Sequence, residues 1–237
     1  MSSVWARDAQ PAPAVLPPPR PTSLSSPAPP PVASVEDKAA VAADAGTCVG
    51  SLVGVAGNQI KPFVQVAKPD PDECRVADPV VVEALAVRTA TGAGQVRLMP
   101  PPTVSCELAR AVSLWLDTSL QPLARGAFGR ELTALRVGGG HECRGRNRQT
   151  QGQLSEHATG RALDIFAFQL GEEKQGGLAV SVERPSGLEQ IRFLDAARQS
   201  ACGAFTTVLG PGSDAAHANH LHGDIQQRRA ASSRFCQ

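Results

Sequence analysis

The sequence predicts an α+β domain in which a small antiparallel sheet carries flanking helices. Runs of β-branched, partly alternating residues predict strands, and two segments whose apolar residues recur at helical spacing predict helices between them. Six cysteines, all of which lie between Cys48 and Cys236, predict that disulfides stabilise the domain. The sequence contains no internal repeat, so a single domain of this class is expected.

The predicted elements follow one another from residue 80 to residue 225. Strands are expected at Val80–Val87, Gln95–Met99, Leu132–Val137, Ala162–Leu170, Leu178–Val182, Phe205–Leu209 and His220–Ile225. A first helix is expected after its N-cap Ser105, and Trp115 is expected to lie in the core. Its apolar face consists of Leu108, Val112, Trp115 and Leu116. A second helix is expected to begin at a capping box formed by Ser186 and Glu189 and to end at Gly203.

Charge and hydropathy exclude three classes of protein. The 237 residues include 23 basic and 22 acidic side chains, which give a net charge of +1. A dedicated nucleic-acid or anionic-membrane binder would carry an excess of basic residues, so neither class is expected. No apolar run approaches the roughly 18–20 residues that a transmembrane helix needs, so no membrane-spanning segment is predicted. The composition predicts no oligomeric state.

Proline is concentrated near the amino terminus. Ten of the 20 prolines lie between Pro11 and Pro31, in a stretch that is otherwise rich in alanine and serine. Such sequences favour extended polyproline geometry and bury no core. We therefore expect residues 1–45 to be a disordered tether and residues 46–237 to form the globular domain. Disorder without any spacer role is the alternative.

The cysteines indicate the compartment. They form no CxxC pair, so neither a zinc ribbon nor a thioredoxin-type redox site is expected. Three disulfides in an oxidising compartment, periplasmic or secreted, are predicted, and six buried thiols in a cytosolic protein are the alternative. Cys202 and Cys236 are the expected pair, because they flank the histidines at positions 217–222. The first ten residues contain no apolar h-region of a signal peptide, so the route of export is not predicted.

Four of the five histidines fall in two short clusters that suggest a metal site. His157 lies on a predicted loop before Asp164, which begins a predicted strand, and Gly160 allows the backbone to turn between them. His220 and His222 alternate along another predicted strand, so their imidazoles point to the same face. Together His157, Asp164 and one of the two later histidines would form a catalytic zinc shell with an open position. The remaining histidine would then be free to act as a general base.

The combination of these motifs is more specific than either motif alone, since isolated histidine pairs are common on protein surfaces. The pattern SxHxxGxAxD, followed later by HxH, resembles the zinc peptidases of the D-alanyl-D-alanine carboxypeptidase and lysostaphin group. More narrowly, roughly residues 46–237 resemble the bacterial extensin-like C-terminal domain family. The residues that support this resemblance are Cys143-Arg144, Ser155-Glu156-His157-Ala158, Cys202, Phe205, Leu209-Gly210-Pro211-Gly212, His217, His220-Leu221-His222 and Cys236.

The resemblance implies a peptidoglycan-directed metallopeptidase fold in the cell envelope and a role for each matched residue. His157, Asp164 and His222 match the three zinc ligands of such enzymes. His220 matches the histidine that handles the proton. The Glu-x-x-His base of some relatives is missing ahead of His220, where Ala216 or His217 would have to serve, so His220 is the expected base.

Two further residues receive roles near the expected zinc ion. Arg144 matches an arginine that binds the developing oxyanion or a substrate carboxylate in the related carboxypeptidases. Its rivals are Arg146, Arg148 and Arg161. Asp224 follows His222 by two residues, so it would share the strand face and orient the ligand imidazole, or else be a surface charge.

The function that this resemblance implies is zinc-dependent hydrolysis of peptidoglycan peptides with D-centres or meso-diaminopimelate. Zinc would polarise the scissile carbonyl, while His220 takes a proton and Arg144 steadies the oxyanion. Endopeptidase and carboxypeptidase action both stay open. Two alternatives remain at this point, namely a non-catalytic wall-binding module that keeps its metal, and a structural zinc site closed by His217 or His220.

Overall fold

The computed structural model describes residues 47–63, 71–149, 152–172, 174, 176–230 and 232–237. These residues belong to the compact unit Ala40–Gln237. The tether expected over residues 1–45 lies outside the described residues. Within the described part of the chain, no helix is both long enough and apolar enough to cross a bilayer.

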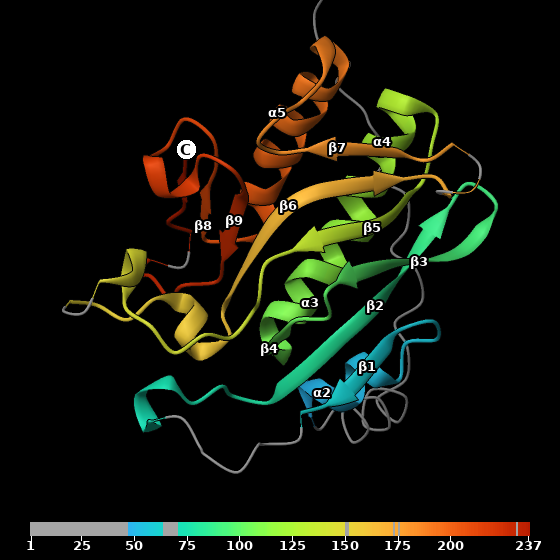
Figure 1. The fold of residues 1–237 in the computed structure, drawn as a ribbon. Coiled ribbons are helices and arrows are strands. Elements are labelled where there is room, and N and C mark those ends of the chain that lie inside the picture. The colour runs from blue at the N-terminus through green and yellow to red at the C-terminus, as the bar shows by residue number, and fades with distance from the viewer. Residues whose placement is uncertain (1–46, 64–70, 150–151, 173, 175, 231) are drawn as a thin grey trace, which may run out of the picture. The chain divides into compact units, whose positions relative to one another are not determined.

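The described residues form an α+β domain built on one ten-stranded sheet (Figure 1). The strands are β1 (Gln59–Pro62), β2 (Pro79–Thr89), β3 (Gly92–Met99), β4 (Thr103–Ser105), β5 (Leu132–Val137), β6 (Ala162–Leu170), β7 (Leu178–Ser181), β8 (Thr207–Leu209), β9 (Leu221–Asp224) and β10 (Phe235–Cys236). Their order is β1-β2-β3-β5-β6-β9-β8-β10, while β4 pairs with β2 and β7 pairs with β6. All seven predicted strands are present, with ends that differ by a few residues.

The sheet is mixed, which corrects the prediction of a small antiparallel sheet. β3 and β5 are parallel, and so are β8 and β10. Between β3 and β5 the chain crosses over through a helical segment, which returns it in the same direction. Alternation of apolar residues reports which face of a strand is buried and carries no information on strand direction.

The first predicted helix begins as expected and extends further. Ser105 caps α3 (Cys106–Trp115) by accepting a 3.2 Å hydrogen bond from the Leu108 amide. One π-helical turn (Leu116–Leu120) then leads into α4 (Gln121–Phe128), which the sequence did not predict. Trp115 lies in the core, as predicted, and its indole donates to the Ser200 hydroxyl at 2.9 Å. A short helix α2 (Cys48–Val53) precedes the sheet.

The second predicted helix is α5 (Gly187–Ala204), which begins after Ser186 as predicted but is capped differently and extends past the predicted stop. The Ser186 side chain makes no capping bond. Instead Gln190, one turn into the helix, accepts a 2.8 Å hydrogen bond from the Ser186 amide. Gln190 therefore accepts the hydrogen bond from the N-cap amide that the capping-box prediction gave to Glu189. The helix also continues through Gly203 to Ala204.

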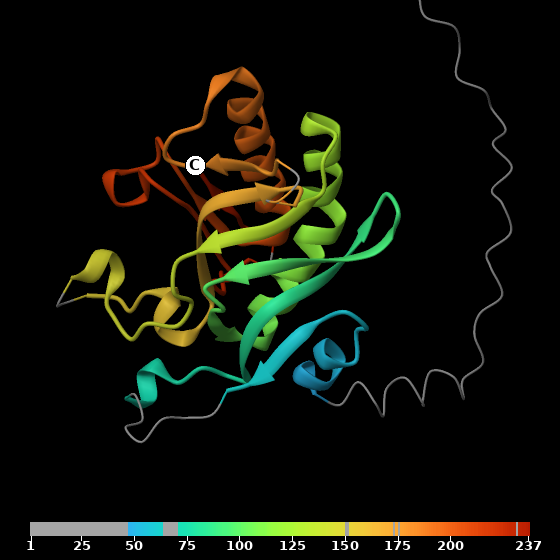
Figure 2. The ribbon, with the colours of Figure 1, turned by 45° about the vertical axis from the view of Figure 1, so that its right-hand side comes forward.

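Helices α3, α4 and α5 pack against one face of the sheet and leave part of the other face open (Figures 1 and 2). Along β6, Leu163 and Ile165 belong to the core, whereas Asp164 and Phe166 point to the open side and line a cavity. The same alternation in β9 buries Leu221 in the core and directs His222 into the cavity. The sheet thereby separates the packed core from the candidate site.

Three disulfides connect the domain, and all six cysteines take part. They join Cys48 to Cys106, Cys74 to Cys143 and Cys202 to Cys236. The pairing of Cys202 with Cys236 confirms the prediction. This bond ties the end of α5 to β10, which pairs with β8 beside the cavity.

Replacing both Cys202 and Cys236 by serine is expected to lower the free energy of unfolding by about 3 kcal/mol, because the bond closes a loop of 34 residues. Urea unfolding of the oxidised proteins, followed by circular dichroism, measures this difference. An unchanged unfolding midpoint would contradict the expectation.

Candidate metal centre

The first two residues of the candidate centre face each other across neighbouring strands. Asp164 in β6 and His222 in β9 are direct partners in the antiparallel register. Both point to the open face of the sheet, and His222 Nδ1 lies 2.8 Å from Asp164 Oδ1. Cross-strand pairing therefore brings together two residues that are 58 positions apart in the sequence.

His157 reaches the same point from a short 3₁₀ helix (Glu156–Thr159) that precedes β6. Ser155 begins this turn by accepting a hydrogen bond from the His157 amide. Gly160 ends it at φ 66°, and a Cβ there would lie 2.9 Å from the Ser105 amide nitrogen. The turn predicted at Gly160 is thus present, and no larger residue would fit it.

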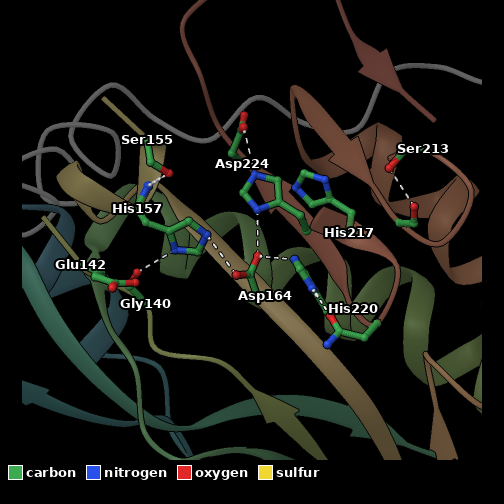
Figure 3. A network of polar contacts seen from close by, with 12 residues as sticks. Gly140, Glu142, Ser155, His157, Asp164, Ser213, His217, His220 and Asp224 are labelled. Atoms are coloured by element: carbon green, nitrogen blue, oxygen red, sulfur yellow. Dashed lines mark hydrogen bonds and ion pairs between the residues drawn. The ribbon is translucent and has the colours of Figure 1, made fainter. Parts of the chain in front are cut away.

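The His157 imidazole is buried and held in one tautomer. Its Nδ1 lies 2.8 Å from the carbonyl oxygen of Gly140, which can only accept, so Nδ1 carries the hydrogen (Figure 3). Gly140 approaches closely because it has no side chain, and a Cβ there would collide with the Thr103 backbone. The opposite nitrogen, Nε2, is buried without a hydrogen-bond partner among the described residues and lies 3.3 Å from Asp164 Oδ2.

This arrangement fits a bound cation. In the neutral imidazole, the lone pair of His157 Nε2 faces a carboxylate oxygen, which is also an acceptor. Two lone pairs directed at each other in a buried position are unfavourable unless a proton or a metal ion lies between them. His157, Asp164 and His222 each offer a ligand atom, and these atoms all lie within 4.8 Å of one another. The three residues therefore meet the requirements of the predicted metal shell.

His222 is held between two carboxylates. Nδ1 faces Asp164, and Nε2 lies 3.2 Å from Oδ2 of the buried Asp224. Asp224 is therefore the partner that orients the His222 ring, as one of the two predictions for it stated, and it is no surface charge. Its other carboxylate oxygen accepts from the Gln226 amide at 3.0 Å. A metal on the Nδ1 side would leave the hydrogen bond from Nε2 to Asp224 in place.

The charges in this group depend on one another. Burial alone would raise the pKa of Asp164, but the imidazoles of His157 and His222 outweigh it and hold that pKa well below its usual range. Burial likewise would lower the pKa of His222, but hydrogen bonds and charges from Asp164 and Asp224 raise it to about 9. At neutral pH the metal-free site therefore holds a His222 imidazolium between two carboxylates.

Zinc binding at pH 7 is expected to release about one proton, because the metal replaces the proton on His222 Nδ1. Calorimetric titrations in two buffers of different ionisation enthalpy measure that proton. Zinc affinity is expected to rise about tenfold per pH unit up to the His222 pKa of about 9. A zinc affinity that does not change between pH 6.5 and pH 8 would contradict this expectation.

The raised pKa of His222 also affects the stability of the metal-free protein. It stabilises the fold fully below about pH 6.5, and this stabilisation is lost as the pH rises through about 9.

Replacing Asp224 by asparagine is expected to weaken zinc binding about 10- to 100-fold, the usual effect of removing a residue that orients a metal ligand. The amide cannot hold the His222 ring by a charged hydrogen bond. Competition with a chromophoric chelator measures the affinity. Equal affinity of the two proteins would mean that Asp224 has no orienting role.

Two more histidines lie beside this group. His220 Nε2 is 3.4 Å from Asp164 Oδ1, and its Nδ1 is 2.8 Å from the Asn219 amide oxygen. His217 lies with its ring 5.3 Å from that of His220, and its Nδ1 bonds Asp214 at 2.7 Å. Neither histidine belongs to the ligand group formed by the described residues. The arrangement favours a site with an open position over a structural site with four protein ligands.

The group forms one wall of a cavity of about 740 Å³ that opens at the surface. Arg144 also lines this cavity, and its Nε donates to Glu142 at 2.9 Å. Of its three rivals, Arg146 and Arg148 line the cavity as well. Arg161 instead pairs with Glu107 at 2.6 Å and contacts Glu156 at 3.7 Å. Cys74 fixes the arginine-rich loop through its disulfide with Cys143.

Several residues of the cavity were missed in the sequence. Asp214, which holds His217, is the N-cap of a 3₁₀ turn (Ala215–His217), and its spacing of three residues is a recognisable pattern. Glu156 lines the cavity, and burial, together with the charge of Asp224, raises its pKa. Phe166 stacks near His220, with ring centroids 5.2 Å apart. The remaining histidine, His141, does not line the cavity, and its Nε2 lies 3.1 Å from the Cys74 carbonyl oxygen.

Comparisons with known proteins identify the family of the chain. Searches of curated proteins and of solved structures find no match, so the relation to D-alanyl-D-alanine carboxypeptidases and lysostaphin stays a prediction. A family model described as the extensin-like protein C-terminus matches residues 48–237. This match includes the three disulfides and all the residues of the candidate metal centre. The chain therefore belongs to the family defined by the extensin-like C-terminal domain.

Proposed function

We propose that this domain is a zinc-dependent peptidase that hydrolyses peptide bonds in peptidoglycan. The observation that supports this most strongly is the buried His157 Nε2, which has no hydrogen-bond partner among the described residues and lies 3.3 Å from Asp164 Oδ2 on the wall of an open cavity. A buried pair of acceptors is costly in a purely structural role. At a cavity wall, the same pair is suited to a catalytic metal.

The residues of the cavity would have different roles in hydrolysis. His157, Asp164 and His222 would hold zinc, which supplies Lewis-acid chemistry that polarises a carbonyl group and makes water more acidic. His220 would accept a proton from water, since burial lowers the pKa of His220 and keeps its ring neutral at pH 7. With its Nδ1 hydrogen directed at Asn219, the ring keeps a free lone pair on Nε2, near Asp164.

Arg144 would stabilise negative charge that develops on the substrate oxygen. Its side chain lines the cavity and is 19% exposed, and Glu142 holds the guanidinium through Nε. The Arg144 carbonyl also accepts a hydrogen bond from the Ser155 amide, two residues before His157. This bond ties the arginine to the loop that carries the first ligand, which is the kind of positioning that oxyanion stabilisation requires.

The three disulfides support a location in an oxidising compartment, and we propose the periplasm or the exterior of the cell. A peptidoglycan substrate would be accessible there. The relation to D-alanyl-D-alanine carboxypeptidases and lysostaphin-type peptidases belongs to the same proposal, and it rests on the HxxxxxxD and HxH motifs.

Digestion of purified muropeptides by the zinc-loaded protein tests this function, with products followed by mass spectrometry. The wild type is expected to release peptides, and His157→Ala is expected to release none. Equal product from both proteins would contradict a role for the metal centre in hydrolysis. No product from either, together with retention of the wild type on isolated cell walls, would instead indicate a wall-binding module.

A further inference from the structure

One arginine of the cavity, Arg228, has no carboxylate partner among the described residues. Arg228 lies in the segment that connects β9 to β10, and its side chain lines the cavity. Its Nη2 donates to the Thr207 hydroxyl at 2.8 Å, while its Nε is buried and bonds to none of the described residues. No carboxylate of the described residues forms an ion pair with it. A guanidinium at a cavity wall without a carboxylate partner keeps an unneutralised charge, and an incoming anionic acceptor would neutralise it.

Three other arginines near the site are already paired with carboxylates. Arg144 and Arg148 both bond Glu142, and Arg161 bonds Glu107. Arg146 lines the cavity too, but its side chain is exposed to solvent. Arg228 therefore combines a place in the cavity, partial burial and a positive charge that no described carboxylate neutralises.

The sheet places Arg228 close to the metal centre. Thr207, which receives its hydrogen bond, lies opposite Asp224 in the pairing of β8 with β9. Asp224 in turn bonds the ligand His222. Adjacent strands are about 4.8 Å apart, so Thr207, which accepts the hydrogen bond from the guanidinium, lies roughly one strand spacing from Asp224. A group bound by Arg228 would therefore belong to the same substrate molecule as the peptide bond that is hydrolysed at the metal centre.

The C-terminal end of the chain fixes the arginine in this place. Its guanidinium carbon lies 5.9 Å from the ring centroid of Phe235, which pairs with Thr207 in the sheet. Cys236, the next residue, is bonded to Cys202 in α5. The guanidinium is thus positioned before any ligand arrives, which lowers the entropy lost on binding.

We infer that Arg228 binds a free carboxylate of the peptide that enters the cavity, so that the domain prefers peptides with free carboxylates to their amidated forms. A guanidinium offers neighbouring N–H groups that match the two oxygens of a carboxylate. The acidic side chains of Glu156, Asp214 and Asp224 line the same cavity, and they disfavour a polyanion such as a phosphate diester chain. This inference rests on the proposed function, since it names the substrate class of that site.

Binding without turnover tests the inference. The probe is a peptidoglycan stem peptide with free carboxylates, compared with the same peptide whose carboxylates are amidated. Affinities for zinc-loaded protein are measured by calorimetry in a His220→Gln background, where hydrolysis is expected to be at least about 10²-fold slower. The free acid is expected to bind about tenfold more tightly than the amide. Arg228→Gln in that background is expected to reduce this preference to about twofold or less, whereas Arg229→Gln, at an exposed neighbour, keeps it.

The outcomes separate this inference from the proposed function. A preference that survives Arg228→Gln, equal affinity of both peptides, or no measurable binding of either peptide would overturn the role of Arg228. A preference that depends on Arg228, in a protein whose wild type releases no product from muropeptides, would leave the carboxylate site in place and overturn only the peptidase function. Hydrolysis of muropeptides by the wild type, without any preference for the free acid, would support the peptidase function and overturn the role of Arg228.

Discussion

Replacing Asp164 by asparagine is expected to weaken zinc binding by more than about 100-fold and to abolish peptide hydrolysis, a larger effect than loss of an orienting partner produces. The Asp164 carboxylate lies 2.8 Å from His222 Nδ1 and 3.3 Å from His157 Nε2. Because its pKa is held far below the usual range, it is ionised throughout the working pH range. The amide has nearly the same shape but no charge, so the variant isolates the electrostatic contribution. Zinc content after dialysis and chelator competition measure the loss.

Asp214→Asn is the matched control for this variant. Asp214 also bonds a histidine of the cavity, His217, but it lies outside the ligand group. The control is expected to retain zinc with near-wild-type affinity, and thermal unfolding shows whether either protein has lost its fold. A folded Asp164→Asn protein that retains zinc as tightly as the control would contradict the assignment of Asp164 as a ligand.

The second large effect is expected for His220→Gln, in which kcat falls about 10²- to 10⁴-fold while zinc content stays constant. Glutamine preserves the size and polarity of the side chain but cannot accept a proton near neutral pH. His220 is not in the ligand group, and its Nε2 lies 3.4 Å from Asp164 Oδ1, so the variant is expected to keep the three ligands and its zinc. Muropeptide hydrolysis under saturating substrate measures kcat, and metal analysis of the same sample measures zinc.

The pH profile distinguishes proton transfer from a structural effect. With the base removed, the acidic limb of the wild-type rate profile is expected to disappear, because that limb reports protonation of His220. His141→Gln serves as the control, since His141 contacts the Cys74 carbonyl and does not line the cavity. A His220→Gln protein with unchanged kcat, or with less zinc than the wild type, would contradict the role of His220 as the base.

Much of the candidate site could be predicted from local sequence patterns. The eight residues from His157 to Asp164 span one turn and the start of one strand, and Gly160 marks the turn. Alternation along β9 places His222 and Asp224 on one face, so their joint direction into the cavity follows from period two. These features are short-range, and residue type and spacing are sufficient to define them.

Other features depend on contacts between distant segments. The carbonyl group that fixes the His157 tautomer belongs to Gly140, which is 17 residues away. In the sequence, Gly140 cannot be distinguished from an ordinary loop glycine. The parallel pairing of β3 with β5 depends on the crossover, which strand periodicity does not encode. Arg228 resembles any surface arginine until the sheet places it beside Thr207. Local patterns therefore predict which groups are present, while the topology decides which of them meet.

The most direct test of the metal centre is anomalous diffraction at the zinc edge from crystals grown with zinc. A single strong peak is expected between His157 Nε2, the Asp164 carboxylate and His222 Nδ1, at distances of about 2.0–2.2 Å from each ligand atom. His220 and His217 are expected to lie outside the coordination shell. A peak coordinated by other residues, a shell closed by His217 or His220, or the absence of a peak at this position would contradict a catalytic zinc site formed by these three residues.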